Sequence, residues 1–249
     1  MAENATLNIY RGDKDGGEMV EYNIPLAPGM VVLDAVHRVQ ALHSPDLAVR
    51  WNCKAGKCGS CGAEVNGRPR LMCMDRMDNY PDGQPISIRP MKTFPIIKDL
   101  VADVSWNYEV NKKIPAFKPR EDMERKFSQE EADRVQEFRK CIECFLCQNV
   151  CHVLREHQLK DQFCGPRFFV RVAGLEMHPL DGEDRTDLLR HDFGIGFCNI
   201  TRCCTEVCPE SITITDNAII PLKERVVDKY FDPLTWLWRK ITGKSNGSK

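Results

Sequence analysis

The stretch that decides the N-terminal fold reads NCKAGKCGSCG over residues 52–62 and places Cys53, Cys58 and Cys61 close together, with Cys73 following. The glycines between these cysteines permit sharp turns, because a residue without Cβ reaches positive φ at no steric cost. We therefore expect a tightly curled loop whose backbone N–H groups point inward at a negatively charged metal centre held by four thiolates.

The spacing of this group separates two kinds of metal centre. Cys-x4-Cys-x2-Cys with a more distant fourth cysteine is typical of plant-type ferredoxins that hold a 2Fe-2S cluster. A structural zinc site also uses four cysteines, but it usually pairs two short Cys-x2-Cys knuckles. The sequence therefore predicts a 2Fe-2S cluster on Cys53, Cys58, Cys61 and Cys73, with zinc as the alternative.

The residues around this loop read as a small mixed sheet with one helix. A helical pattern covers 31–42, and short apolar-polar runs are separated by turn signals. The runs are 6–10, 19–25, 62–65, 70–73 and 86–89. We place the first domain at 1–110 and the second at 111–249. The second domain begins with a linker over 111–122, after which we expect mainly helices. Ser128 opens a capping box toward Lys140, and Pro166 precedes a predicted helix over 167–176.

A second cysteine group lies in the helical half. Its first run is Cys141-x2-Cys144-x2-Cys147-x3-Cys151, which is typical of two-cluster bacterial ferredoxins, where the fourth cysteine serves the other cluster. A second run contains Cys198, Cys204 and Cys208-Pro209, with Thr201 where a further cysteine is expected.

If each run gives its fourth cysteine to the cluster of the other run, these cysteines form two ligand sets. Cys141, Cys144, Cys147 and Cys208 form a complete set that suits a 4Fe-4S cluster, while Cys151, Cys198 and Cys204 form a set of three that suits a 3Fe-4S cluster. Because a threonine hydroxyl is a poor iron ligand, the corner opposite Thr201 should lack iron; a labile fourth iron is the alternative. Cys164 and Cys203 remain, and we expect both to behave as small buried hydrophobes, with Cys203 pointing away from the cluster.

Composition limits the function classes. The chain has 249 residues, 13 cysteines and a formal net charge of −1. The near-neutral charge argues against nucleic acid as a partner, and the odd cysteine count argues against a paired disulfide framework. Neither an export signal nor an apolar run long enough for a transmembrane segment is expected. With no nucleotide-binding fingerprint and no catalytic residues of its own, the chain reads as an electron conduit.

The order of the motifs resembles the iron-sulfur subunit of succinate dehydrogenase and fumarate reductase over nearly the whole chain. The resemblance implies an α+β fold: an N-terminal β-grasp plant-type 2Fe-2S ferredoxin domain and a C-terminal all-helical bacterial-ferredoxin-like domain. It implies electron flow from the FAD of a flavoprotein subunit through the 2Fe-2S, 4Fe-4S and 3Fe-4S clusters to quinone, as in succinate dehydrogenase (EC 1.3.5.1). It also implies membrane-anchor subunits and a peripheral place on the cytoplasmic face of a bacterial plasma membrane.

Departures from the family pattern fall on the quinone side. Many members have proline after the fourth cysteine of the first run, then tryptophans; here His152 follows, with His157 further on. Many also have histidine where this chain has Asn199. His152, Asn199 and Thr201 are therefore candidates for the quinone side, and surface histidines on an exposed helix are the alternative for His152 and His157.

The C-terminal tail, residues 230–249, combines aromatic and basic side chains, including Trp236 and Trp238. This composition is typical of segments at a membrane interface, and ordinary packing of the tryptophans is the alternative. For the whole chain, the alternatives are a fumarate reductase running in reverse, or a soluble electron-transfer module of another dehydrogenase or a heterodisulfide-reductase-like complex.

Overall fold

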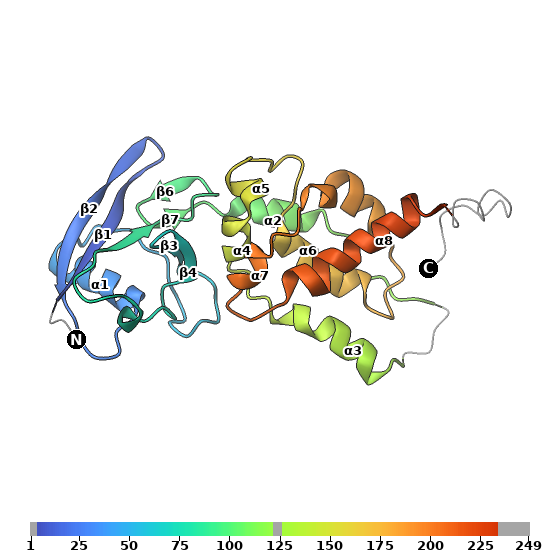
Figure 1. The fold of residues 1–249 in the computed structure, drawn as a ribbon, viewed down its shortest axis with the longest axis horizontal. Helices are drawn as coiled ribbons and strands as arrows, with labels where there is room; N and C mark the ends of the chain where they lie inside the picture. Colours follow the sequence, from blue (N-terminus) through green and yellow to red (C-terminus); the bar gives the residue numbers. More distant parts are fainter. Residues whose placement is uncertain (1–3, 122–125, 234–249) are drawn as a thin grey trace. The chain divides into compact units, whose positions relative to one another are not determined.

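The chain forms two compact units in the computed structural model, which describes residues 4–121 and 126–233 (Figure 1). Unit 1 comprises Met1–Trp106, Ile142–Val150 and Val207–Pro209, and unit 2 comprises Asn107–Cys141, Cys151–Glu206 and Glu210–Lys249. Two short segments from the helical half of the sequence therefore belong to the same unit as the N-terminal sheet.

Unit 1 is built on a seven-stranded mixed sheet in the order β4-β3-β5-β1-β6-β7, with β2 paired to β1. Strand β1 pairs in parallel with β5 and antiparallel with β2. The strands are β1 (Asn4–Asp13), β2 (Gly16–Pro25), β3 (Gly62–Val65), β4 (Arg68–Leu71), β5 (Ile86–Arg89), β6 (Ile96–Lys98) and β7 (Val101–Ala102). The predicted sheet is confirmed, and β3 and β5 have the predicted bounds.

The core of unit 1 lies between this sheet and helix α1 (Val32–Leu42). Leu7 and Ile9 alternate with more exposed residues along β1, as expected for a strand with one buried face. Val36 and Val39 recur at helical spacing on α1 and are fully buried. Fully burying a side chain of this size stabilises the fold by roughly 1.5–3 kcal/mol.

A buried polar network fixes helix α4 (Leu146–Val150) to the rest of unit 1. The Asn149 side-chain amide donates to Glu64 Oε1 at 2.8 Å and its carbonyl oxygen accepts the Thr93 N–H at 3.0 Å. The Thr93 hydroxyl donates to the Asn149 backbone carbonyl at 3.1 Å. All three residues are buried, so the network ties a segment 85 residues away in sequence to strand β3.

Unit 2 is helical, which confirms the predicted α+β fold class. Its helices include most of α2 (Ser105–Lys112), then α3 (Gln129–Gln136), α5 (His152–Arg155), α6 (Pro166–Glu176), α7 (Cys203–Glu206) and α8 (Ile220–Tyr230). Short 3-10 or π turns are η1 (Met77–Asn79, in unit 1), η2 (Glu137–Lys140), η3 (Leu188–Asp192), η4 (Ile195–Phe197) and η5 (Ile214–Ile219). The Ser128 capping box is present, with Glu131 N donating to Ser128 Oγ at 3.2 Å.

The helix predicted to run toward Lys140 changes to a 3-10 turn at Glu137. The Glu137 carboxylate accepts hydrogen bonds from Thr213 N at 2.6 Å and from the Asn217 side chain at 2.5 Å. These contacts reach residues 76 and 80 positions away, so a local helix pattern could not reveal them.

The predicted linker, 111–122, is held against unit 2 over part of its length. Arg185, whose side chain is fully buried, donates to the carbonyl oxygens of Pro115 at 3.1 Å and Ala116 at 2.8 Å. The same guanidinium pairs with Asp181 at 2.9 Å and lies 3.8 Å from Glu176. This buried charged group holds part of the connecting segment, residues 111–122, in place. The proline-rich composition of this segment alone would have predicted an unstructured linker.

Candidate iron-sulfur cluster sites

The loop over residues 53–61 directs backbone N–H groups at cysteine sulfur atoms. Cys53 Sγ accepts from Ala55 N at 3.4 Å and from Lys57 N at 3.3 Å, and Cys73 Sγ accepts from Gly56 N at 3.3 Å. Donors aimed at sulfur stabilise thiolates, so the loop fits a negatively charged cluster. Gly56 and Gly59 have φ of +68° and +70°, as the predicted curl requires.

The pKa shifts of Cys58 and Cys61 arise partly from the other predicted ligands of this loop. Burial opposes ionisation of Cys58, but hydrogen bonds with Ser60 and Cys53 lower its pKa to about 6. Burial raises the pKa of Cys61 to about 12, and interactions with Cys73 and Cys58 contribute. The structure therefore brings Cys53, Cys58, Cys61 and Cys73 together.

Unit 1 also packs this loop closely against the second cysteine group. A Cβ added at Gly59 would lie 2.7 Å from Cys144 Cα and 3.0 Å from its backbone nitrogen. Only glycine allows this approach, because those atoms are backbone and cannot move aside as a flexible side chain can. Cys144 and Cys147 are buried, and Cys208 is partly exposed in the same unit, whereas Cys141 belongs to unit 2.

The two runs of the helical half share an unusual backbone pattern. Glu143 and Phe145, with φ of 57° and 60°, flank Cys144. Ile200 and Arg202, with φ of 61° and 64°, flank Thr201 in the same way. Alternation of left-handed residues turns successive N–H groups toward one side and forms an anion-binding nest. Thr201 therefore occupies the backbone position in its loop that Cys144 occupies in the other.

The predicted three-cysteine set lies together in unit 2. Burial raises the pKa of Cys151 to about 12, and the nearby thiols of Cys203 and Cys204 add to the shift. Burial likewise raises the pKa of Cys204 to about 11, with contributions from Cys203 and Cys198. The thiol of Cys204 thus lies close enough to interact with those of both Cys151 and Cys198.

The two leftover cysteines differ from each other. Cys164 is buried, its thiol donates to the Gly165 carbonyl at 3.5 Å, and burial raises its pKa well above the usual value, as expected of a small hydrophobe. Cys203 lies nearer the three-cysteine set than we expect from its sequence position. Its sulfur is 3.3 Å from the Thr201 hydroxyl, and its thiol influences Cys151 and Cys204.

Two contacts of the 198–204 loop in unit 2 could not be predicted from the sequence. Lys223 Nζ on α8 donates to the Cys198 carbonyl at 2.6 Å, and the Thr215 hydroxyl lies 3.5 Å from Cys204 Sγ. Both partners come from helical segments after the last cysteine, so motif spacing could not identify them.

The candidate quinone-side residues are exposed to different degrees. Asn199 and Thr201 are exposed, and His152 is half-buried. The rings of His152 and His157 meet edge to face, with centroids 6.1 Å apart. The tail prediction for Trp236 and Trp238 concerns residues outside the described part of the chain, which ends at Pro233.

The described residues contain neither a site for a single metal ion nor a membrane-spanning helix. No group of three or more His, Cys, Asp or Glu side chains there is arranged to hold a single metal ion. No helix in residues 4–121 or 126–233 is long and apolar enough to cross a bilayer. Ligands of a cluster lie further apart than ligands of one ion, because bridging sulfides and several irons separate them.

Comparison with known families assigns both cysteine regions. Residues 6–109 match a 2Fe-2S iron-sulfur cluster binding domain, and residues 137–212 match a 4Fe-4S dicluster domain. These two domains on one chain define an iron-sulfur electron-transfer protein.

Comparisons over most of the chain identify its family within the iron-sulfur electron-transfer proteins. The chain is 32% identical to the fumarate reductase iron-sulfur subunit of Mycobacterium tuberculosis, over 77% of this chain and 79% of that protein. It is 30% identical to the corresponding subunit of Wolinella succinogenes, over 91% and 99%. A chain of the solved Mycobacterium smegmatis Sdh1 complex in the apo form is 57% identical, with a TM-score of 0.91 and coverage of 94% and 100%. The chain belongs to the family of succinate dehydrogenase and fumarate reductase iron-sulfur subunits.

Proposed function

We propose that this electron-transfer subunit works in the direction of succinate oxidation, in a succinate:quinone oxidoreductase (EC 1.3.5.1). Its clusters would carry electrons from the FAD of a flavoprotein subunit through 2Fe-2S, 4Fe-4S and 3Fe-4S centres to quinone. The 57% identity to a chain of an Sdh1 complex is the observation that supports this direction most strongly. Fumarate reduction is the second candidate, because relatives with that name also match most of the chain.

The ligand sets of this proposal follow the cysteine runs. Cys53, Cys58, Cys61 and Cys73 hold the 2Fe-2S cluster, and Cys141, Cys144, Cys147 and Cys208 hold the 4Fe-4S cluster. Cys151, Cys198 and Cys204 hold the 3Fe-4S cluster, with Thr201 opposite the absent iron. The domain boundaries we propose are 1–110 and 111–249. The amides of Ala55, Gly56 and Lys57 would offset thiolate charge in the first site.

The partners of the chain belong to the same proposal. Dicarboxylate chemistry needs a flavoprotein subunit, because this chain contributes ligands to electron carriers and no catalytic residue. Membrane-anchor subunits would place the chain peripherally on the cytoplasmic face of a bacterial plasma membrane. Support comes from the likeness to subunits of such complexes.

Purification of the native complex tests the proposed partners. We expect this chain to copurify with a subunit carrying covalent flavin and with hydrophobic anchor subunits, and the preparation to reduce a quinone when succinate is added. A soluble flavin or thiol-redox partner, with no hydrophobic subunit, would support the alternative module and contradict the proposal.

A substitution at Thr201 tests the three-iron site. Thr201→Cys should supply the missing thiolate, abolish the paramagnetic signal of the oxidised 3Fe-4S centre and add one iron to the Mössbauer count. Thr201→Ser is the matched control and should leave both unchanged. The Cys203→Ser background excludes the neighbouring thiol as the ligand. Loss of the signal in Thr201→Ser, or its persistence in Thr201→Cys, would contradict the assignment.

The quinone side is tested through His152. We propose that His152, Asn199 and Thr201 face the quinone, and we expect His152→Ala to slow quinone reduction several-fold while cluster potentials stay unchanged. His157→Ala is the control for the paired ring. Unchanged quinone reduction in His152→Ala would make His152 an ordinary surface residue.

A further inference from the structure

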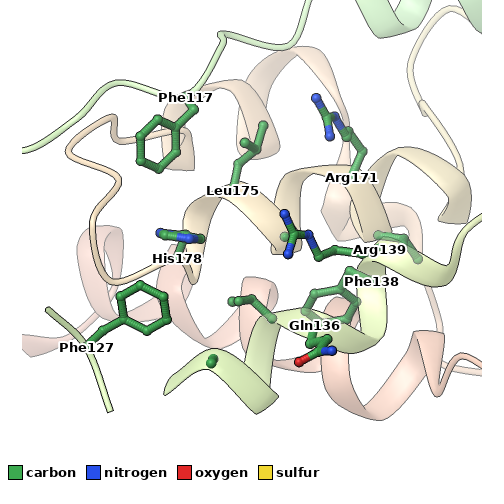
Figure 2. Close-up of a pocket in the computed structure, with 12 residues that line it drawn as sticks. Phe117, Phe127, Gln136, Phe138, Arg139, Arg171, Leu175 and His178 are labelled. Carbon is green, nitrogen blue, oxygen red and sulfur yellow. The ribbon is translucent and has the colours of Figure 1, made fainter. Parts of the chain in front are cut away.

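Unit 2 contains a cavity that the electron-transfer function does not use. Its volume is about 390 Å³, within the range of about 300–1,000 Å³ that small-molecule pockets occupy. Residues of the connecting segment, α3, η2 and α6 surround it (Figure 2), and the lining residues within 4–121 and 126–233 include no cysteine. The argument rests on six of these residues: Phe117, Phe127, Arg139, Arg171, Leu175 and His178.

One side of the cavity is an aromatic wall. Figure 2 shows the His178 ring between the rings of Phe117 and Phe127. The His178 centroid lies 5.2 Å from that of Phe117 and 5.7 Å from that of Phe127, both in edge contacts. Phe117 and Phe127 are 41% and 44% exposed, so both rings keep apolar surface that a ligand can cover.

The polar groups of the cavity are mainly hydrogen-bond donors. His178 Nδ1 accepts a hydrogen bond from Leu180 N at 3.2 Å. The neutral ring therefore carries its proton on Nε2, which can donate. Arg139 extends from η2 toward the aromatic wall, and Arg171 contributes a second guanidinium from α6.

The positive charge of the cavity has no internal counterion among the described residues. The side chains of Arg139 and Arg171 form no ion pair or hydrogen bond with any other residue of 4–121 or 126–233. The lining residues from that part of the chain include no carboxylate. Guanidinium groups stay charged at all physiological pH values and match the geometry of a carboxylate. A ligand that supplied a carboxylate would therefore complete this site.

We propose that this cavity binds a small amphipathic carboxylate, a molecule with one carboxylate and an aromatic or short aliphatic body. The carboxylate accepts hydrogen bonds from Arg139, with Arg171 and His178 as further donors. The apolar body covers Phe117, Phe127 and Leu175. A wholly polar dicarboxylate fits less well, because it would bury a second charge against the phenyl rings.

Binding of 4-phenylbutyrate to the intact complex tests the proposal. In equilibrium dialysis we expect saturable binding of one molecule per chain. The alcohol 4-phenylbutanol has the same apolar body without the charge, and succinate has charge without that body; each should bind at least about tenfold more weakly. Equal binding of phenylbutyrate and phenylbutanol, or no saturable binding of phenylbutyrate, would overturn the proposal.

Three variants locate the binding. Arg139→Gln should weaken phenylbutyrate binding at least about tenfold, whereas Arg134→Gln, which changes an exposed α3 arginine outside the cavity lining, should leave it unchanged. Gly174→Met should abolish binding, because Gly174 lines the cavity and the methionine side chain would occupy it. The variant should still fold, because a Cβ added at Gly174 would lie 3.4 Å from Phe138, an ordinary contact distance. Unaltered cluster absorption in each variant confirms folding. Wild-type binding in both Arg139→Gln and Gly174→Met would refute the site.

Discussion

Two cysteine loops, over 53–61 in unit 1 and 198–204 in unit 2, reach left-handed backbone conformations with different residues. The Cys144 loop of unit 1, with Glu143 and Phe145, resembles the second of them. In unit 1, the loop over 53–61 does so at Gly56 and Gly59 as well as Lys54. In unit 2, the loop from Cys198 to Cys204 does so at Ile200 and Arg202. For a non-glycine residue this conformation costs roughly 1–2 kcal/mol, and a β-branched residue such as Ile200 is especially unsuited to it.

This difference shows where each loop obtains its shape. Two of the three left-handed positions of the first loop, Gly56 and Gly59, are glycines and adopt the conformation without strain, so its sequence largely favours the required turns. The second loop is strained, and strain of this kind persists only when the surrounding structure holds it. In unit 2 that surrounding structure includes Lys223 on the Cys198 carbonyl and, further away in the chain, the buried ion cluster of Arg185. The 198–204 loop should therefore be more sensitive than the 53–61 loop to changes outside the loop itself.

The largest expected effect comes from breaking the Arg185 cluster. Arg185→Met leaves the buried carboxylate of Asp181 without its cation, removes one of the two cations near Glu176, and should destabilise unit 2 by about 3–5 kcal/mol. Hydrogen exchange should show faster opening of α6, and the 3Fe-4S signal should be lost before the 2Fe-2S signal.

Arg225 provides the control for this prediction. It lies 3.9 Å from Glu176, but its side chain is 36% exposed, so Arg225→Met should have a much smaller effect. Loss of the 2Fe-2S signal first, or together with the 3Fe-4S signal, would remove the proposed contrast between the units.

A smaller effect is expected from glycine substitution in unit 1. Gly59→Ala combines positive φ with a contact of 2.7 Å to Cys144 Cα and should cost about 2–3 kcal/mol. Gly56→Ala has nearly the same φ, but its new Cβ meets the flexible Met74 side chain, so it should cost less. The iron content and thermal stability of the 2Fe-2S site measure both. Equal losses would show that backbone proximity at Gly59 is unimportant.

The smallest effect has the opposite sign. Ile200→Gly should relieve the left-handed strain in unit 2 and slow loss of the 3Fe-4S signal during heating, with a gain of up to about 1 kcal/mol. Ile200→Ala removes the β-branch but keeps a residue with Cβ at positive φ, so it should give a smaller gain. A gain of equal size in both variants would trace the effect to the side chain instead of the backbone.

The sequence predicted those features that depend on neighbouring residues. Turn signals bounded β3 and β5, and the cysteine spacing predicted the curled loop over 53–61. Thr201 could be recognised from spacing alone as the residue in the place of a cysteine. The left-handed conformations beside it could not, because Ile200 has little preference for them.

Features that depend on distant residues were missed. The assignment of Ile142–Val150 to unit 1 rests on Asn149, whose partners Glu64 and Thr93 lie far away in sequence. The fixed connecting segment rests on Arg185, about 70 positions from the carbonyl groups it binds. Cys203 was expected to point away, but its contact with Thr201 places it beside the three-cysteine set.

Quantitative electron paramagnetic resonance of the intact complex tests the central claim most directly. The oxidised complex should show the signal of one 3Fe-4S centre per chain, and stepwise reduction should reveal separate 2Fe-2S and 4Fe-4S centres, with about nine iron atoms per chain in total. A complex with only two spin systems, or with no three-iron signal when oxidised, would contradict the account of one chain that carries three clusters.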